Sequence, residues 1–449
     1  MFEKEKELVG KFEEFGLLET FDKLYENKDE VHTNVLRLVK DERVIKLAIS
    51  QLKYCHKNES EIVKEIQNLQ PKTMKDGVVL ETFKHCLWLV LEPICEKHFS
   101  EHSYGGRNCC RVENFMGEAM RMVNIGKNYN VVKVDYKGIT ETIKPCKLNQ
   151  LLWKLGIQDK ALFPFITKIV KSKNLGCLKN LFTNVYLNEI DNRIYEQWEG
   201  YATDLKGRGW KTNIPKPRYT KTGQRHLGSE YAVLRKYTTM KEMYFVRYNN
   251  VLLVFTKKPE DMERIKYSLI NYTRKQFNFE LNESSIECKN LKKKSVSFLG
   301  FKLNVTRKGN KYVAETHLTD LSMEYIITMH RQNIKKMKKT LNSYEYNNFI
   351  EQVHSYFRIA TMVNLDFDKI RFRTNKCFYN QLHAITTKTT LTKQSKYYKF
   401  YGLSNEVYKL KKLDQVVLPI GYVQTRNAMN KSRGFTLYTP KGREILNKY

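Results

Sequence analysis

MYFVRYNNVLLVF, residues 243–255, places two runs of β-branched and aromatic residues on either side of an Asn-Asn pair. Residues of these types favour strands, and asparagine tolerates the positive φ that a tight turn between antiparallel strands needs. The stretch therefore predicts a β-hairpin that turns at Asn249 and Asn250. Such hairpins are common in proteins of every function, so the rest of the chain decides how this one is interpreted.

The chain carries a large excess of positive charge. Its 449 residues include 79 Lys and Arg against 48 Asp and Glu, a formal net charge of +31. This excess indicates a polyanionic partner, and nucleic acid is the first candidate. Residues 1–50 hold 9 basic and 12 acidic side chains, whereas residues 331–449 hold 23 basic and 7 acidic ones, a net of +16. We therefore expect nucleic-acid contacts in the C-terminal quarter.

Composition excludes several other classes of protein. Hydrophobic residues make up 41% of the chain and aromatic residues 12%, which predicts a folded core. The nine cysteines include no C-x-x-C and no paired Cys/His spacing, so we expect reduced thiols and no zinc site. No apolar run approaches the length of a membrane span, and the first residues resemble neither a signal nor a transit peptide. If the protein works in an organelle, we expect it to be made there or to lack its presequence here.

The pattern of apolar residues predicts an α+β fold with helices behind a small antiparallel sheet. The predicted strands are 131–136, the hairpin 243–255, and a strand pair or bent strand around Gly300 in 295–305. A break or kink is expected at Pro93, and 203–228 is expected to be an exposed basic connection. The predicted helical stretches are 1–68, 76–99, 111–126, 147–170, 178–194, 260–277 and 319–364.

Two C-terminal features suit RNA. In the predicted helical region 319–364, apolar Ile334, Met337 and Leu341 lie on one face while basic residues lie largely elsewhere, as in an amphipathic helix with a basic side. Many solvated helices share this pattern. The tail, 388–449, interleaves Lys and Arg with tyrosines, a combination that can bind phosphates and stack on unpaired bases. The alternative is a small basic helical domain whose tyrosines belong to its core.

Taken in order, these pieces resemble the reverse transcriptase-like maturases encoded within group II introns. The similar segments are DGVVLETFKHCLWLVLEPICEKHFSEHSYG (76–105), VVKVDYKGITETI (131–143), NLGCLKNLFTNVYLNEID (174–191), FVRYNNVLLVF (245–255), SVSFLGFKL (295–303) and YTPKGREIL (438–446). They are similar to the family's fingers segment ending in H-S-Y-G, its first palm motif D-I-K-G-x-F-D, its Q-G-G-I-L-S-P-L-L-A-N-I-Y-L-x-E-L-D, its Y-V-R-Y-A-D-D-F, its F-L-G-F and the end of its maturase domain. The Lys- and Asn-rich composition is most similar to plastid versions, including those of euglenoid group III introns.

The resemblance also implies that the polymerase site is degenerate. Polymerisation needs carboxylates that hold two divalent ions. Asp135 keeps the first ligand, but the paired aspartates of the family's hairpin fall on Asn250 and Val251, which cannot replace hard anionic ligands. Glu141 stands where the first palm motif has its second acid and does not restore the hairpin pair. The family's F-R-P is missing after H-S-Y-G, and Arg107 aligns with the next basic position.

The family's organisation implies a helical extension over 1–68, reverse transcriptase-like fingers and palm over 69–310, and a helical thumb and maturase (X) domain over 311–449. It implies a protein that is not an enzyme, has no cofactor or metal, and assists splicing by binding structured intron RNA. A plastid location, an organelle gene and a ribonucleoprotein follow from the same resemblance. The expected phosphate contacts are Arg331, Lys335, Lys338, Lys339, Arg426, Lys431, Arg433, Lys441 and Arg443.

Two alternatives remain from the sequence. One is an active reverse transcriptase of an intron-mobility or defence type, with unusual metal ligands. The other is a general RNA-binding scaffold without an intron partner. The sequence leaves open which intron is bound and the oligomeric state.

Overall fold

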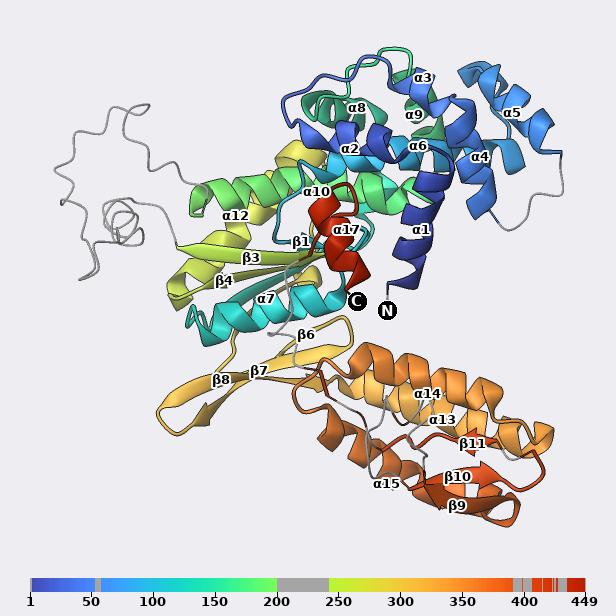
Figure 1. Ribbon diagram of the computed structural model, residues 1–449. Helices are drawn as coiled ribbons and strands as arrows, with labels where there is room; N and C mark the ends of the chain where they lie inside the picture. The colour runs from blue at the N-terminus through green and yellow to red at the C-terminus, as the bar shows by residue number, and fades with distance from the viewer. Residues whose placement is uncertain are drawn as a thin grey trace, which may run out of the picture. The chain divides into compact units, whose positions relative to one another are not determined.

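The computed structural model describes residues 2–52, 58–199, 242–390, 398, 406–413, 415–421, 423, 425, 426 and 434–448. Its contacts divide the chain into two compact units, each described by itself below. The first unit comprises residues 1–115, 132–288 and 432–449, and the second comprises 116–131 and 289–431 (Figure 1). These units are discontinuous in sequence and do not follow the predicted boundaries at 68 and 310. The division into fingers, palm and thumb stays a prediction. The expected basic connection 203–228 lies outside the described residues.

Helices dominate the first unit. They are α1 (Glu3–Glu14), α2 (Leu18–Glu26), α3 (Val35–Val39), α4 (Glu42–Gln51), α5 (Glu59–Gln67), α6 (Val78–Glu96), α8 (Pro145–Lys154), α9 (Phe163–Lys171), α10 (Leu178–Gln197), α12 (Pro259–Phe277) and α17 (Pro440–Asn447), with short 3₁₀ turns η1 (Pro71–Thr73), η2 (Ile139–Thr142) and η3 (Glu283–Ser285). Helix α7 (Val112–Asn124) begins in this unit and ends in the second. Helix α6 is buried over most of its length and contacts α2, α3, α4, α5 and α10. It is therefore the central helix of the unit.

The structure differs from two details of the predicted helices. The chain does not break at Pro93, because α6 continues through it to Glu96. The stretch predicted as one helix over 147–170 is two, α8 and α9. They are separated at Gly156, whose φ is +86° and where a Cβ would lie 2.7 Å from the carbonyl oxygen of Glu30. Only glycine accommodates both that conformation and that approach.

The sheet of the first unit is built around the predicted hairpin. Its strands are β1 (Ser103–Tyr104), β2 (Asn130–Asp135), β3 (Met243–Tyr248), β4 (Val251–Thr256) and β5 (Ile286–Asn290), in the order β1-β3-β4-β2-β5. Strands β3 and β4 are antiparallel and pair Tyr248 with Val251 across the turn, as predicted. The sheet is mixed and not wholly antiparallel, because β1 pairs with β3 in parallel. Helices α10 and α12 lie on one side of it (Figure 1).

The described part of the second unit contains two small sheets, most of α7 and further helices. Strands β6 (Val296–Phe298), β7 (Phe301–Lys308) and β8 (Lys311–Leu318) form an antiparallel sheet, and the β6–β7 turn contains Gly300 at φ +82°. Helices α13 (Asp320–Thr340), α14 (Tyr344–Phe357) and α15 (Val363–Leu382) follow, with a short 3₁₀ turn η4 (His383–Ile385). The second sheet, in the order β11-β10-β9, consists of β9 (Thr386–Thr390), β10 (Glu406–Leu410) and β11 (Val416–Val417). The region 311–449, predicted to be helical, thus contains strands β8 to β11 in addition to its helices.

Candidate nucleic-acid interface

The hairpin turn and the end of β2 bring together the three residues predicted as a vestigial polymerase site. The Asn250 side-chain amide Nδ2 donates to Asp135 Oδ1 at 2.5 Å, and the same oxygen accepts from the backbone N–H of Lys137 at 3.0 Å. The backbone N–H of Tyr136 donates to the carbonyl oxygen of Asn250 at 2.8 Å. Val251 is buried. The site is thus a hydrogen-bonded turn with one charged group.

This set of groups does not fit a pair of divalent ions. Asn250 turns amide hydrogens towards Asp135, and Val251 has no donor atom for a metal. Glu141 is exposed on η2 and forms no hydrogen bond with Asp135, which is also among the described residues. Among the described residues, no three His, Cys, Asp or Glu side chains are grouped so that they could hold a metal ion. Two-ion phosphoryl chemistry needs several hard anionic ligands, and the turn supplies one.

A buried ion pair holds the hairpin in place. Arg247 on β3 and Asp191 on α10 are both fully buried, and the guanidinium meets the carboxylate at 2.7–2.9 Å through Nε and Nη2. The remaining donors reach Ser103 Oγ at 2.6 Å, Asn184 Oδ1 at 2.9 Å and the carbonyl oxygen of Asn249 at 2.7 Å. A buried charge pair is stable only when its other hydrogen-bonding groups are satisfied, as here. The network ties the turn to β1 and α10.

The two glycines that follow Ser103 and Tyr104 adapt the chain to the same turn. Gly105 has φ +83°, and a Cβ there would lie 2.9 Å from the backbone nitrogen of Asn249. The backbone N–H of Asn249 in turn donates to the carbonyl oxygen of Tyr104 at 3.0 Å. The Gly105-Gly106 break in the sequence therefore marks a close backbone approach to the hairpin.

Arg107, which the resemblance aligned with the basic position after the missing F-R-P, is engaged inside the protein. Its guanidinium donates to both carboxylate oxygens of Glu96 at 2.6–3.1 Å and to the carbonyl oxygen of Ser100 at 2.8 Å. Burial disfavours the charged guanidinium, but the carboxylate of Glu96 more than offsets this and raises the pKa of Arg107. The side chain is only 10% exposed. Its geometry is that of a structural ion pair.

Helix α13 presents the clearest basic face. Its buried side contains Ile326, Ile327, His330, Ile334 and Met337. Arg331, Lys335, Lys338 and Lys339 are exposed at i, i+4, i+7 and i+8, so they lie on a common face. Arg331 donates to the carbonyl oxygen of Arg373 at 2.9 Å. The ammonium groups of the three lysines make no hydrogen bond or ion pair with another described residue, which leaves them available to phosphates.

The other predicted contacts are dispersed. Arg426 belongs to the second unit, where its backbone N–H donates to the carbonyl oxygen of Arg358 at 2.7 Å. Lys441 is exposed on α17 in the first unit. Arg443, also on α17, pairs through two nitrogens with the carboxylate of Asp22 at 2.6 and 2.7 Å, so its guanidinium is already occupied. Lys431 and Arg433 lie outside the described residues. RNA contact by each of these residues stays a prediction.

A second basic cluster was not predicted from the sequence. In the second unit, a hollow of about 410 Å³ is lined by Lys292, Lys293, Lys294, Lys302 and Lys369, together with Asp320 and Asp366. Lys302 pairs with Asp320 at 2.5 Å and Lys369 lies 3.7 Å from Asp366. Five cations face two carboxylates, so the hollow has an excess of positive charge. The run of three lysines was the visible signal. Nothing in the sequence indicated that Lys369 of α15 lines the same hollow.

Comparisons with known proteins add no identification. Neither the protein-family models searched nor the curated proteins searched contain a match to this chain. Within the described part of the chain, no helix combines the length and the apolar character needed to cross a bilayer. The functional interpretation therefore rests on the motifs and on the geometry above.

Proposed function

We propose that this protein is a maturase that binds the structured RNA of a group II or group III intron and assists its splicing without polymerising nucleotides. The observation that carries the proposal is the hydrogen bond from Asn250 to Asp135, in the hairpin where the similar family has paired aspartates. The hydrogen bond from the amide holds the turn together without a metal ion. A scaffold that resembles a polymerase in sequence is thereby left with binding as its function.

In this proposal the RNA is the catalyst and the protein is its ligand. A ligand shifts a conformational equilibrium only by binding one state more tightly than the others. The exposed lysines of α13 supply unpaired charge for a dense array of phosphates, which a compact intron fold presents and an extended strand does not. The protein would then favour the splicing-competent fold by its differential affinity.

The cellular location of the protein and its assembly with other components are part of the same proposal. The composition and motifs favour a plastid protein encoded in the organelle that acts in a ribonucleoprotein. Structured intron RNA is the proposed partner.

Crosslinking in the native cells, followed by sequencing of the attached RNA, tests the proposal directly. Reads concentrated on one or a few introns, including one that encodes the protein, are the expected result. Reads distributed over transcripts in proportion to their abundance would instead favour the general RNA-binding scaffold.

A primer-extension assay with Mg²⁺ or Mn²⁺ separates the proposal from an active reverse transcriptase. No DNA synthesis is expected from the purified protein. Synthesis that is abolished by Asp135→Ala would refute the absence of polymerase activity, because this substitution removes the one carboxylate of the turn.

A further inference from the structure

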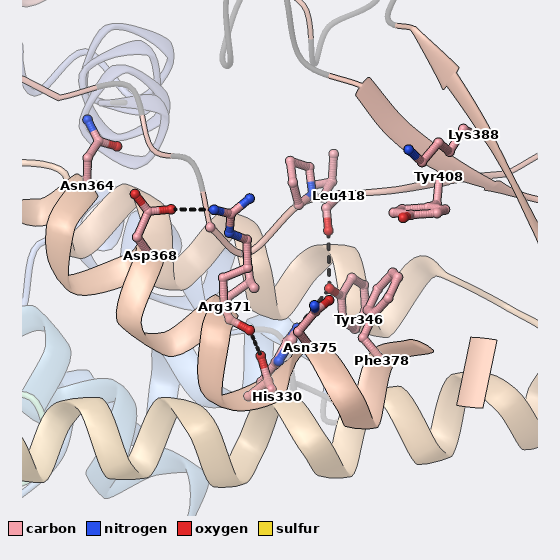
Figure 2. Close-up of a pocket in the computed structure, with 14 residues that line it drawn as sticks. His330, Tyr346, Asn364, Asp368, Arg371, Asn375, Phe378, Lys388, Tyr408 and Leu418 are labelled. Atoms are coloured by element: carbon pink, nitrogen blue, oxygen red, sulfur yellow. Dashed lines mark hydrogen bonds and ion pairs between the residues drawn. The ribbon is translucent and has the colours of Figure 1, made fainter. Parts of the chain in front are cut away.

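The second unit contains a hollow of about 700 Å³ that no part of the proposed function uses. It lies between α15 and the sheet of β9 and β10, and the segment 418–421 closes one side (Figure 2). Its volume falls in the range of about 300–1,000 Å³ that is typical of small-molecule sites. The residues that decide its chemistry are Arg371, Asn375, Phe378, Lys388 and Tyr408.

The face of α15 that lines the hollow is polar. Asn364, Asp368, Arg371, Asn375 and Phe378 follow one another at spacings of 4, 3, 4 and 3 residues, so they form one stripe along the helix. A helix stripe that packs directly on a sheet is normally apolar. The apolar residues of α15 are instead buried elsewhere, as Val363, Phe367 and Ile370 show. The stripe therefore has the composition of a binding surface and not of a core.

Two aromatic rings meet in the hollow. Phe378 of α15 and Tyr408 of β10 have their ring centroids 5.1 Å apart with an interplanar angle of 54°. Both side chains are half-buried. Because the rings are tilted and not stacked on each other, each keeps a face on which a flat ligand can lie.

Cations flank the rings on both sides. Lys388 of β9 is the direct cross-strand partner of Tyr408, so its side chain leaves the sheet on the same face as the ring. On the helix side, Arg371 is held by Asp368 at 3.1 Å and packs against Gly421 so closely that a Cβ there would lie 2.9 Å from its Nε. The Arg371 guanidinium is thus positioned by two neighbours.

A buried histidine in the lining of the hollow has an acceptor without a donor. Tyr346 Oη donates to the carbonyl oxygen of Leu418 at 3.1 Å and lies 3.0 Å from His330 Nε2. The hydroxyl has one hydrogen, so Nε2 must carry the hydrogen of the second bond and Nδ1 is a bare acceptor. Burial lowers the pKa of His330 to about 3, which keeps the ring neutral. Nδ1 is buried and has no hydrogen-bond partner among the described residues.

We propose that this hollow binds one unstacked nucleotide of the RNA, with its base against Phe378 and Tyr408 and its phosphate between Arg371 and Lys388. The inference rests on the proposed function, because the ligand is a segment of the bound RNA. Stacking on aromatic rings beside cations is how proteins hold single-stranded RNA.

The test uses the purified full-length protein and a single-stranded oligoribonucleotide that contains one 2-aminopurine, whose fluorescence is quenched when it stacks. Phe378→Ala is expected to weaken binding about tenfold and to reduce the quenching. The matched control is Phe372→Ala, because Phe372 is 85% exposed on the same helix and does not line the hollow. This control is expected to behave as the wild type. Arg371→Gln changes an exposed side chain and is expected to weaken binding with the fold intact.

The outcomes separate this inference from the proposed function. RNA binding and quenching that are equal in the Phe378 and Phe372 variants and unchanged by Arg371→Gln would overturn the nucleotide site while RNA binding itself stands. A wild-type protein that does not bind RNA would overturn both. In the last measurement, the protein is titrated with adenosine monophosphate alone. Binding as tight as that of the oligoribonucleotide would overturn the assignment to RNA and point to a free nucleotide as the ligand.

Discussion

Replacement of Lys335, Lys338 and Lys339 by glutamine should remove much of the electrostatic part of RNA binding. The three ammonium groups are exposed and make no ion pair with another described residue, so no internal contact is lost with them. Glutamine keeps most of the side-chain length and a good helix propensity. The fold of α13 should therefore survive, and the change in affinity should report charge alone.

The size of the effect follows from the number of phosphates that these lysines neutralise. Each contact contributes about 0.9 to the slope of log affinity against log salt for a duplex and about 0.7 for a single strand. Three lost contacts lower the slope by about 2.1–2.7. Between 1 M and 0.1 M salt, one decade, the same figures give a loss of roughly 100- to 500-fold in affinity at the lower salt and almost none at the higher.

The assay is a titration of labelled intron RNA at several salt concentrations. The control replaces Lys4, Lys6 and Lys23 by glutamine, three exposed lysines on the N-terminal helices α1 and α2, where acidic residues outnumber basic ones. It removes the same charge from the protein as a whole. If both variants lost affinity equally, net charge and not the α13 face would govern binding. An unchanged salt slope in the α13 variant would refute its role as a phosphate-binding surface.

Three further results are expected. Asp191→Ala leaves the Arg247 guanidinium buried without its partner and should lower the free energy of unfolding by about 3–5 kcal/mol. A loss below about 1 kcal/mol in urea denaturation would contradict a stabilising role of this buried network. Asn250→Asp sets a second carboxylate against Asp135, which should raise the pKa of the pair and make the Tm rise with added Mg²⁺, and an equal rise in the wild type would contradict a turn that needs no metal. Burial lowers the pKa of His354 to about 4, so the unfolded chain binds this proton first and stability should fall as the pH drops from about 6.5 towards 4. Denaturation at both pH values should show a smaller fall in His354→Gln, and an identical fall would exclude His354 as its source.

The local elements of the fold could be predicted because their signals are local. The hairpin follows from two β-rich runs around Asn249 and Asn250, and Asn249 indeed adopts φ +49°. The amphipathic pattern of α13 correctly placed Ile334 and Met337 in the core. Both patterns depend on residues within a few positions of one another, which is the range at which periodicity is informative.

The assembly of the units could not be predicted, because it depends on contacts between distant residues. Arg443 pairs with Asp22, 421 positions away, and this pairing helps to place α17 in the first unit. Strand β1 has only two residues and pairs with β3 through the backbone, so it leaves no periodic signal. The sheet of β9 to β11 is likewise short, and its Thr- and Lys-rich first strand does not alternate apolar and polar residues.

The candidate sites likewise differ in how far they could be predicted from the sequence. Asn250 and Val251 drew attention in the sequence because the family that it resembles has a fixed motif at these positions. The polar stripe of α15 would be interpreted as a solvated face from its sequence alone. Only the strands that lie opposite, with Lys388 and Tyr408 at facing positions, make it one wall of a hollow.

Asp135 has a structural role that does not depend on polymerase chemistry. Its Oδ1 accepts hydrogen bonds from the Asn250 side chain and from the backbone N–H of Lys137, so the carboxylate closes the turn that follows β2. With an aspartate at position 250, two anions would lie within hydrogen-bonding distance, and a cation or a shared proton would have to offset their repulsion. The amide removes that repulsion and adds a donor. An asparagine at 250 therefore gives the aspartate at 135 a structural role that needs no metal ion.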